Sequence, residues 1–549
     1  MTRMIAVSLA AFAFAAPATA DDFDTAYNAI TGENIAADVA VLASDEFEGR
    51  GPGGRGERLT IDYIASRFEE AGAGPAFDDS YFQPFGIAEY VKRNTADFDL
   101  SGPSGTLGLA LASDYVLFAG QPGERLELTD STVVFGGFGI TAPEEDWDDY
   151  AGLDLTGRTL VLFRGDPGTA TNDETLFDGN ALTVHGLVGT KFETAAAQGA
   201  SAVILIHTEQ SAGYPWATLS SGGVGGTQYF LTEDDGDHLT MVAHVSEEAG
   251  RRIFDAAGLD FDTVYTEAAT RGFRAIESEL TASGTLEGQV SLAETNNVVG
   301  RITGSEAPEE CVIYTAHWDH MGINPLAPTD DTIFNGALDN ATGTAMLINL
   351  ARAYGSLDTN PRRSVYFFAT AAEERGFLGT EHYISDPACA LADTVAVFNM
   401  DAHFPFADHW QAMTVPGLGT SELEDILGDA AARLGRELQE DSNPAAGGFF
   451  RSDHWPFIKV GVPGIYAVGS PNEAQVEADP DILPRFAAYM TGGYHHAADE
   501  YDAEAWLMGG IEGDARIYFE AGHSVANDDR YPNFYLDTPY RRLRDAMLR

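Results

Sequence analysis

From residue 297 onward, short apolar stretches typical of buried strands alternate with segments of helical spacing. This alternation predicts an α/β fold with a mainly parallel, twisted sheet and helices on both faces, because parallel strands need a crossover and helices usually provide it. The expected strands span residues 297–302, 311–316, 364–370, 394–400 and 462–468. The expected helices span residues 341–354, 377–384 and 421–434, with two earlier helices at 36–43 and 59–71.

Histidine and acidic side chains follow directly after three of these strands. His317 follows the second strand, Glu373 and Glu374 follow the third, and Asp401 follows the fourth. Ligands bind beyond the carboxyl ends of parallel strands, so these side chains should converge at one edge of the sheet. Converging carboxylates repel one another strongly unless a cation lies between them. The pattern therefore predicts a metal site.

Two further residues complete the expected ligand set. Asp339 lies just before the helix at 341–354, and His495 lies in the segment Y-H-H-A-A-D at 494–499. Imidazole and carboxylate ligands without thiolates suit zinc with open coordination positions, as a catalytic site needs. The three carboxylates of the set carry three negative charges. Two Zn²⁺ and one hydroxide would make the cluster neutral, so the charge count favours two Zn²⁺ over one.

Five motifs occur along the chain in a fixed order. They are A-H-W-D-H at 316–320, L-D-N-A-T-G at 338–343, A-E-E-R-G at 372–376, N-M-D at 399–401 and Y-H at 494–495. Together they resemble the motifs of co-catalytic zinc exopeptidases of the aminopeptidase and glutamate carboxypeptidase type. The resemblance extends over nearly the whole mature chain, and it implies a zinc-peptidase-like fold that binds two Zn²⁺ and hydrolyses peptides.

The resemblance also implies how the ligands are divided between two metal ions. His317 and Asp401 would bind one Zn²⁺, and Glu374 and His495 would bind the other. Asp339 would bridge the two ions. Both histidines of the last motif are candidates, and the spacing to Asp499 favours His495 over His496.

Glu373 and Asp319 are the expected catalytic residues. Glu373 would act as general base, taking a proton from water and returning it to the leaving amine. Asp319 would accept the second ring N–H of His317 and fix its tautomer. His454 and Tyr494 are the candidates for binding substrate and polarising its carbonyl group.

Two other histidines near the motifs, His320 and His403, are expected to support ligands or to pack. Taken singly, each residue of the set has an ordinary structural explanation, since a lone histidine at a strand end is usually a hydrogen-bonded structural residue. The combination in one order is what predicts the metal site.

Residues 110–278 have a different sequence pattern, which predicts short strands and turns. Strands are expected at 132–135, 159–164 and 202–207, and a helix at 192–198. With W-D-D-Y at 147–150 and G-Y-P-W at 213–216, the stretch resembles the protease-associated (PA) domain often inserted in such enzymes. The expected organisation is a signal peptide at 1–20, an N-terminal part of the peptidase domain at 21–109, a smaller mixed α/β PA insert at 110–278 and a catalytic zinc peptidase domain at 279–549.

The first 20 residues have the features of a secretory signal. Arg3 precedes an apolar run at 4–16, and Ala18 and Ala20 fit a cleavage site after Ala20. The apolar run is shorter than the roughly 20 residues that span a bilayer. We therefore expect no membrane insertion and an exported protein, periplasmic or extracellular.

The charge of the chain restricts its partners. Its 549 residues include 85 Asp and Glu against 31 Lys and Arg, a formal net charge of −54. Nucleic acid is not an expected partner, because a phosphate backbone is bound mainly by Lys and Arg. The only cysteines, Cys311 and Cys389, are too few for a disulfide framework, and a single disulfide and two buried thiols remain equal alternatives.

The leading expectation is a secreted dizinc aminopeptidase acting on peptides. Carboxypeptidase or dipeptidase action is the nearest alternative, because the same zinc chemistry serves either end of a peptide. Glutaminyl cyclisation, which by resemblance uses one zinc ion and lacks the insert, is a further alternative. A binding protein without catalysis is the least expected, since all ligands and the base are present.

Overall fold

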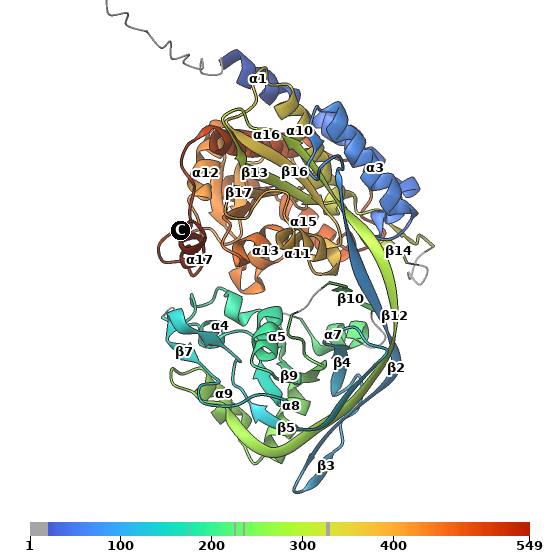
Figure 1. Cartoon of the computed structure of the whole chain (residues 1–549), viewed down its shortest axis with the longest axis vertical. Coiled ribbons are helices and arrows are strands. Elements are labelled where there is room, and N and C mark those ends of the chain that lie inside the picture. The colour runs from blue at the N-terminus through green and yellow to red at the C-terminus, as the bar shows by residue number, and fades with distance from the viewer. Residues whose placement is uncertain (1–19, 174, 213, 224–226, 234–235, 325–329) are drawn as a thin grey trace, which may run out of the picture.

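The chain forms two lobes connected by two long antiparallel strands (Figure 1). The computed structural model describes residues 20–549 apart from 174, 213, 224–226, 234–235 and 325–329. β2 (Phe82–Gly102) and β12 (Ile276–Ile302) pair along most of their length and run from one lobe into the other. Through them the strands of both lobes join one 14-stranded sheet.

The upper lobe of Figure 1 is built on a mainly parallel sheet, which confirms the expected fold class. In spatial order its strands are β20 (Gly464–Tyr466), β17 (Thr394–Asn399), β13 (Ala307–His317), β16 (Arg363–Thr370) and β12. β13 is parallel to β16 and β17, and β17 is parallel to β20, whereas β12 is antiparallel to β16. The sequence predicted these strands, although β12 starts 21 residues before the expected strand at 297.

Helices cover both faces of this sheet because successive side chains of each strand point to opposite faces. Val312 and Tyr314 of β13 pack beneath one helical layer, and Cys311 and Ile313 pack against the other. The first layer contains α10 (Thr342–Gly355) and α16 (Met508–Asn527), and the second contains α11 (Leu378–Ser385) and α13 (His454–Lys459). The structure joins Cys311 and Cys389 in a disulfide, which decides between the two alternatives.

The N-terminal helices pack on the outside of the upper lobe. They are α1 (Ala20–Ala29), α2 (Gly32–Leu42) and α3 (Arg55–Glu70), and Ile35, Val39 and Ile64 are fully buried in the core of this lobe. The expected signal peptide lies outside the described residues except for Ala20. No helix in the described part of the chain combines the length and apolarity needed to cross a membrane.

The part of the sheet in the lower lobe is smaller and of mixed direction, as expected for this stretch. Its strands are β4 (Tyr115–Ala119), β5 (Arg125–Phe135), β8 (Thr159–Phe163), β9 (Ala202–His207) and β11 (Met241–Ser246). β5, β8, β9 and β11 are parallel, and β4 is antiparallel to β11. The expected domain boundary at 278 falls inside β12, because this strand belongs to both lobes.

Candidate metal centre

The expected ligands come from turns at the carboxyl edge of the upper sheet. His317 is the last residue of β13, and Asp401 follows β17 after one intervening residue. Glu374 lies in the short turn η5 (Glu373–Arg375) beyond β16. Asp339 lies in η4 (Ala337–Ala341), immediately before α10. His495 follows α15 (Ile482–Gly492).

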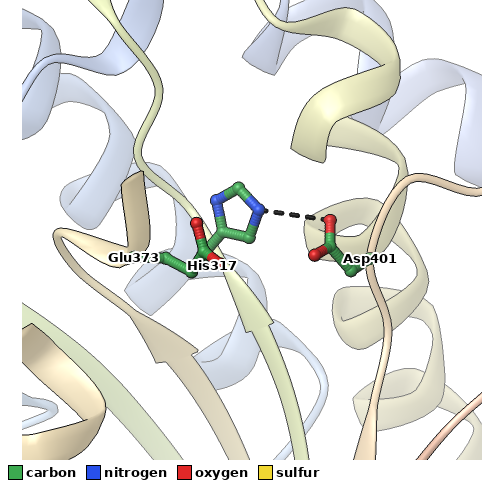
Figure 2. Close-up of side chains that lie close together, drawn as sticks. All are labelled: His317, Glu373 and Asp401. Carbon is green, nitrogen blue, oxygen red and sulfur yellow. Dashed lines mark hydrogen bonds and ion pairs between the residues drawn. The ribbon is translucent and has the colours of Figure 1, made fainter. Parts of the chain in front are cut away.

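The first group of donor atoms surrounds His317. Its Nε2 atom lies 3.2 Å from Oδ1 of Asp401 and 3.3 Å from Oδ1 of Asp339. A carboxylate oxygen of Glu373 completes a set in which donor atoms of Glu373, His317 and Asp401 all lie within 4.8 Å of one another. Figure 2 shows these three side chains close together, with the ring of His317 directed toward Asp401 and the interaction between them drawn.

The second group surrounds His495. Its Nε2 atom lies 3.2 Å from Oδ2 of Asp339 and 3.2 Å from Oε2 of Glu374. The two oxygens of Asp339 therefore face two different histidines. This is the arrangement required of a carboxylate that bridges two metal ions.

The donor separations fit zinc. Two ligand atoms at 2.0–2.1 Å from a tetrahedral zinc ion lie about 3.3–3.4 Å apart. The four separations within the two groups are 3.2 or 3.3 Å. The chemistry of the donors agrees as well, since imidazole and carboxylate ligands without thiolate suit a zinc ion with open positions.

The electrostatics of the two groups also favour cations. Burial by itself lowers the pKa of His317, but Glu373, Asp401 and Asp339 raise it well above its ordinary value. In the second group, burial lowers the pKa of His495, and Asp339 and Glu374 raise it to about 10. Surroundings that stabilise two imidazolium charges also stabilise metal ions, which bind the neutral imidazole in place of the proton.

Comparison with known proteins identifies the segment that contains these residues. Residues 297–509 match the family described as peptidase family M28. We refer to these residues as the M28 segment. All five expected ligands and Glu373 lie within the M28 segment.

Individual proteins also match parts of this chain. Aminopeptidase NAALADL1 of Mus musculus is 28% identical over 172 residues, which are 30% of this chain and 20% of that protein. Aminopeptidase YwaD of Bacillus subtilis is 23% identical over 291 residues, or 52% of each chain. The matches thus span about a fifth of the first relative and about half of the second. The solved structure of an aminopeptidase from Aneurinibacillus sp. strain AM-1 shares the fold, with a TM-score of 0.50 and 18% identity over 94% of this chain and 98% of that one.

Within the M28 segment, Glu373 has the surroundings of a group that takes up a proton. Burial raises its pKa, and the negative charges of Asp401, Asp453 and Glu374 raise it further, whereas His317 opposes them; the net result lies well above the ordinary value. Glu374, the next residue, carries its carboxylate toward His495 instead. The adjacent glutamates therefore face different groups of donors.

Asp319 does not make the expected contact. Nδ1 of His317 donates to the backbone carbonyl of Asp319 at 3.1 Å, whereas the nearer carboxylate oxygen lies 3.9 Å away. The chain turns after His317, so the carbonyl two residues later reaches the ring before the carboxylate does. Oδ1 of Asp319 instead accepts the backbone N–H of Glu373 at 3.0 Å. Asp319 thus holds the turn that carries the candidate base.

The two candidate substrate residues have different environments. His454 is fully buried, its ring lies 5.6 Å from the rings of Phe449 and Tyr466, and neither ring nitrogen has a hydrogen-bond partner within the described part of the chain. His454 therefore packs instead of binding substrate directly, contrary to the expectation. Tyr494 is 38% exposed and stacks on His495 with ring centroids 3.8 Å apart, at the rim of the second group.

Direct contacts to ligand oxygens come from His320 and Ser452. Nδ1 of His320 lies 2.7 Å from Oε1 of Glu374, leaving Oε2 to face His495. The hydroxyl of Ser452 donates to Oδ2 of Asp401 at 2.6 Å, leaving Oδ1 for the first group. The sequence indicated a supporting role for His320 but gave no signal for Ser452. His403 bonds Asp514 at 2.7 Å instead of a ligand.

Asp499 and Arg50 hold the ligand turns through backbone atoms. Asp499 accepts the N–H of Leu338 at 2.9 Å and that of Asp339 at 3.0 Å. The Arg50 guanidinium is fully buried and donates to four backbone carbonyls, those of Leu42, Trp318, Asn335 and Gly336. In the sequence analysis Asp499 served only to choose between His495 and His496. No sequence pattern indicated a role for Arg50.

Proposed function

We propose that the protein is a zinc-dependent aminopeptidase that binds two Zn²⁺ and removes residues from the N-terminus of peptides. The observation that carries the proposal is the division of the Asp339 oxygens between His317 and His495, with Glu373 beside the first group. The match of the M28 segment to a peptidase family, and the aminopeptidases among the relatives, support the same activity.

The proposed ligands are His317, Asp339 and Asp401 for one ion and Asp339, Glu374 and His495 for the other. When bound, zinc supplies Lewis acidity toward the substrate carbonyl and lowers the pKa of water in the site. Glu373 accepts the proton of the attacking water, because its carboxylate lies beside both donor groups of the first site. The same carboxyl group then donates this proton to the leaving amine.

Two residues are proposed to keep the proton transfer in place. Asp319 holds the backbone of Glu373, so it fixes the position of the base without touching substrate. Tyr494, exposed beside His495, is proposed to donate a hydrogen bond to the oxygen that becomes negatively charged. Its removal should lower kcat more than it raises KM.

The proposal is tested with aminoacyl-p-nitroanilides before and after chelation. Activity should disappear with the chelator and return with Zn²⁺, and two ions per chain should bind. Glu373→Gln should lower kcat by about 10²–10⁴-fold, while Glu306→Gln, an exposed glutamate in the turn before β13, should leave it unchanged. Turnover that resists chelation would refute the proposal.

Peptides blocked at one end separate the alternative activities. A substrate with an acetylated N-terminus should resist cleavage, and one with an amidated C-terminus should be cleaved. The opposite result would establish a carboxypeptidase. One tightly bound Zn²⁺ per chain together with cyclisation of N-terminal glutamine would establish a glutaminyl cyclase.

We further propose that the protein is exported after cleavage near Ala20, and that the lower lobe is a PA domain that limits the site to short or unfolded chain ends. The composition of residues 1–20 supports the first statement, and the mixed α/β sheet opposite the metal centre supports the second. N-terminal sequencing of the secreted protein tests the cleavage. Equal rates on a folded protein and on its unfolded form would contradict the restriction.

A further inference from the structure

A cavity lies where the two lobes meet, and none of the proposed metal ligands lines it. Its volume is about 730 Å³, which is in the range of small-molecule and peptide side-chain sites. Residues of the lower lobe, such as Asp178 and Leu182, line it together with Phe449 and Tyr540 of the upper lobe. The backbone N–H of Leu182 donates to the carbonyl of Pro444 at 3.3 Å, so the lobes are in contact at this point.

The walls of the cavity are strongly acidic. Six carboxylates line it against one arginine and one histidine, namely Glu144, Glu145, Asp178, Glu440, Asp441 and Asp537 against Arg542 and His185. Glu144 is paired with His185 at 2.8 Å and Glu145 with Arg271 at 3.4 Å. Asp178, Glu440 and Asp537 have no ion-pair partner within the described part of the chain. A cationic ligand would relieve this repulsion.

The phenol of Tyr540 is an independent sign of a ligand. Tyr540 is 9% exposed, lines the cavity, and its hydroxyl makes no hydrogen bond to any residue that the structure describes. The side chain is largely buried but the hydroxyl oxygen keeps solvent access, so it opens into the cavity, where water or a ligand can bond it. Burial and then the charge of Asp178, another residue of the cavity wall, raise the pKa of Tyr540.

Packed aromatic side chains lie between the cavity and the residues around the metal centre. Phe449 lines the cavity, and its ring lies 5.6 Å from that of His454, which in turn lies 5.6 Å from Tyr466 at the end of β20. Phe377, whose N–H donates to the carbonyl of Glu373 at 3.0 Å, packs in the same apolar cluster as Tyr540. The wall of the cavity therefore packs against residues that adjoin the turn of Glu373.

We infer that the inter-lobe cavity binds a basic side chain, lysine or arginine, of the peptide substrate, at a position C-terminal to the bond that is cut. Unpaired carboxylates would bind the cationic head, the Tyr540 hydroxyl would complete the polar contacts, and the aromatic walls would pack against the aliphatic stem or face the cation. This inference rests on the proposed function, because it takes the peptide to be a substrate cut at the metal centre.

The test uses the full-length zinc-loaded enzyme and a set of eight-residue peptides with an N-terminal leucine. One lysine is moved from position 2 to position 8, and norleucine replaces it in the neutral counterpart. At one position lysine should lower KM about tenfold relative to norleucine, as expected for one or two partly buried charge pairs. Equal KM values for lysine and norleucine at every position would overturn the inference.

Variants assign the effect to the cavity. Asp178→Asn combined with Asp537→Asn should remove the preference for lysine and leave kcat and KM for the norleucine peptides unchanged. Tyr540→Phe should reduce the preference about threefold, the effect of one hydrogen bond. Glu279→Gln, an exposed glutamate of β12 outside the cavity, is the matched control and should change nothing. A preference that survives in the double variant would contradict the assignment.

Binding separates this inference from the proposed function. Calorimetry with the Glu373→Gln variant measures the affinity for the lysine peptide without turnover. Tighter binding of lysine than of norleucine, lost on adding the Asp178 and Asp537 changes, supports the cavity even if no peptide is hydrolysed. Saturable binding of Ca²⁺ that depends on the same aspartates, without a preference for lysine, would show a metal site instead and overturn the inference.

Discussion

The buried Arg50 guanidinium should control both the stability of the protein and its affinity for zinc. It lies outside the M28 segment, yet it donates to the carbonyls of Trp318 and Gly336, which flank two turns carrying proposed ligands. Its other two bonds go to Leu42 and Asn335. Burial lowers the pKa of Arg50 to about 10, and the nearby acidic residues oppose this, so the group remains charged at neutral pH.

The cost of removing it follows from these four bonds. Each buried carbonyl left without a donor costs about 1–3 kcal/mol. Arg50→Met leaves three, because the carbonyl of Gly336 also accepts the N–H of Ala341 at 3.2 Å. Relief of the desolvation of the charge offsets part of the sum, so we expect a loss of about 4 kcal/mol in the free energy of unfolding. Arg50→Lys keeps the charge, but one ammonium cannot span the four positions of the fork, and we expect about 2 kcal/mol.

The assay separates stability from ligand positioning. Urea unfolding of the zinc-free protein gives the stability, and competition with a chromogenic chelator gives the zinc affinity. Because the turns that carry the ligands become looser, Arg50→Lys should weaken zinc binding by about 10–100-fold, the usual effect of changing a group that orients ligands. Arg58→Lys, an exposed arginine on α3, is the control. Unchanged zinc affinity in a destabilised Arg50→Lys variant would refute the positioning role.

Other predictions concern the remaining supports and the acidic groups. Ser452→Ala removes the 2.6 Å donor to Asp401 and should weaken binding of one Zn²⁺ about tenfold in the chelator competition. Asp499→Asn can accept only one of the N–H groups of Leu338 and Asp339 well, and should likewise lower zinc affinity about tenfold, whereas exposed Asp502→Asn should not. Chelation should lower the melting temperature in a scan, because the carboxylates lose the cations that offset their repulsion. Burial raises the pKa of Asp149 to about 7, so this group binds a proton more tightly in the folded state; its contribution to stability should fall as pH rises from about 4 to about 7, and Asp149→Asn should flatten that part of the urea-unfolding profile.

The sequence predicted the framework of the upper lobe because its signals are local. The apolar strands that end at His317 or precede Asp401 are recognisable from their own residues. Parallel pairing then brings the ends of these strands to one edge of the sheet. The long course of β12 was missed, although its residues carry a strand pattern. Apolar or small side chains such as Leu280, Leu286 and Val290 alternate with polar ones along its first half, which pairs with β2 and β5.

The contacts of Asp319 and His454 could not be predicted from neighbouring residues in the sequence. The spacing of His317 and Asp319 predicts that they meet, but whether the carbonyl or the carboxylate reaches the ring depends on the turn between them. His454 was a candidate for binding substrate, yet its buried ring packs near Phe449 and Tyr466. Both outcomes depend on backbone direction and on partners that are distant in sequence.

The supports around the metal centre divide into two kinds, and the division has a physical reason. His320 and Ser452 each bond one oxygen of a ligand that needs only its other oxygen for a metal ion. Asp339 has no oxygen to spare, since one faces His317 and the other faces His495. Any side-chain donor to these oxygens would compete with a metal ion for them. Asp499 avoids the competition by binding the backbone N–H of Asp339, so the bridging residue is held firmly while both of its oxygens stay available.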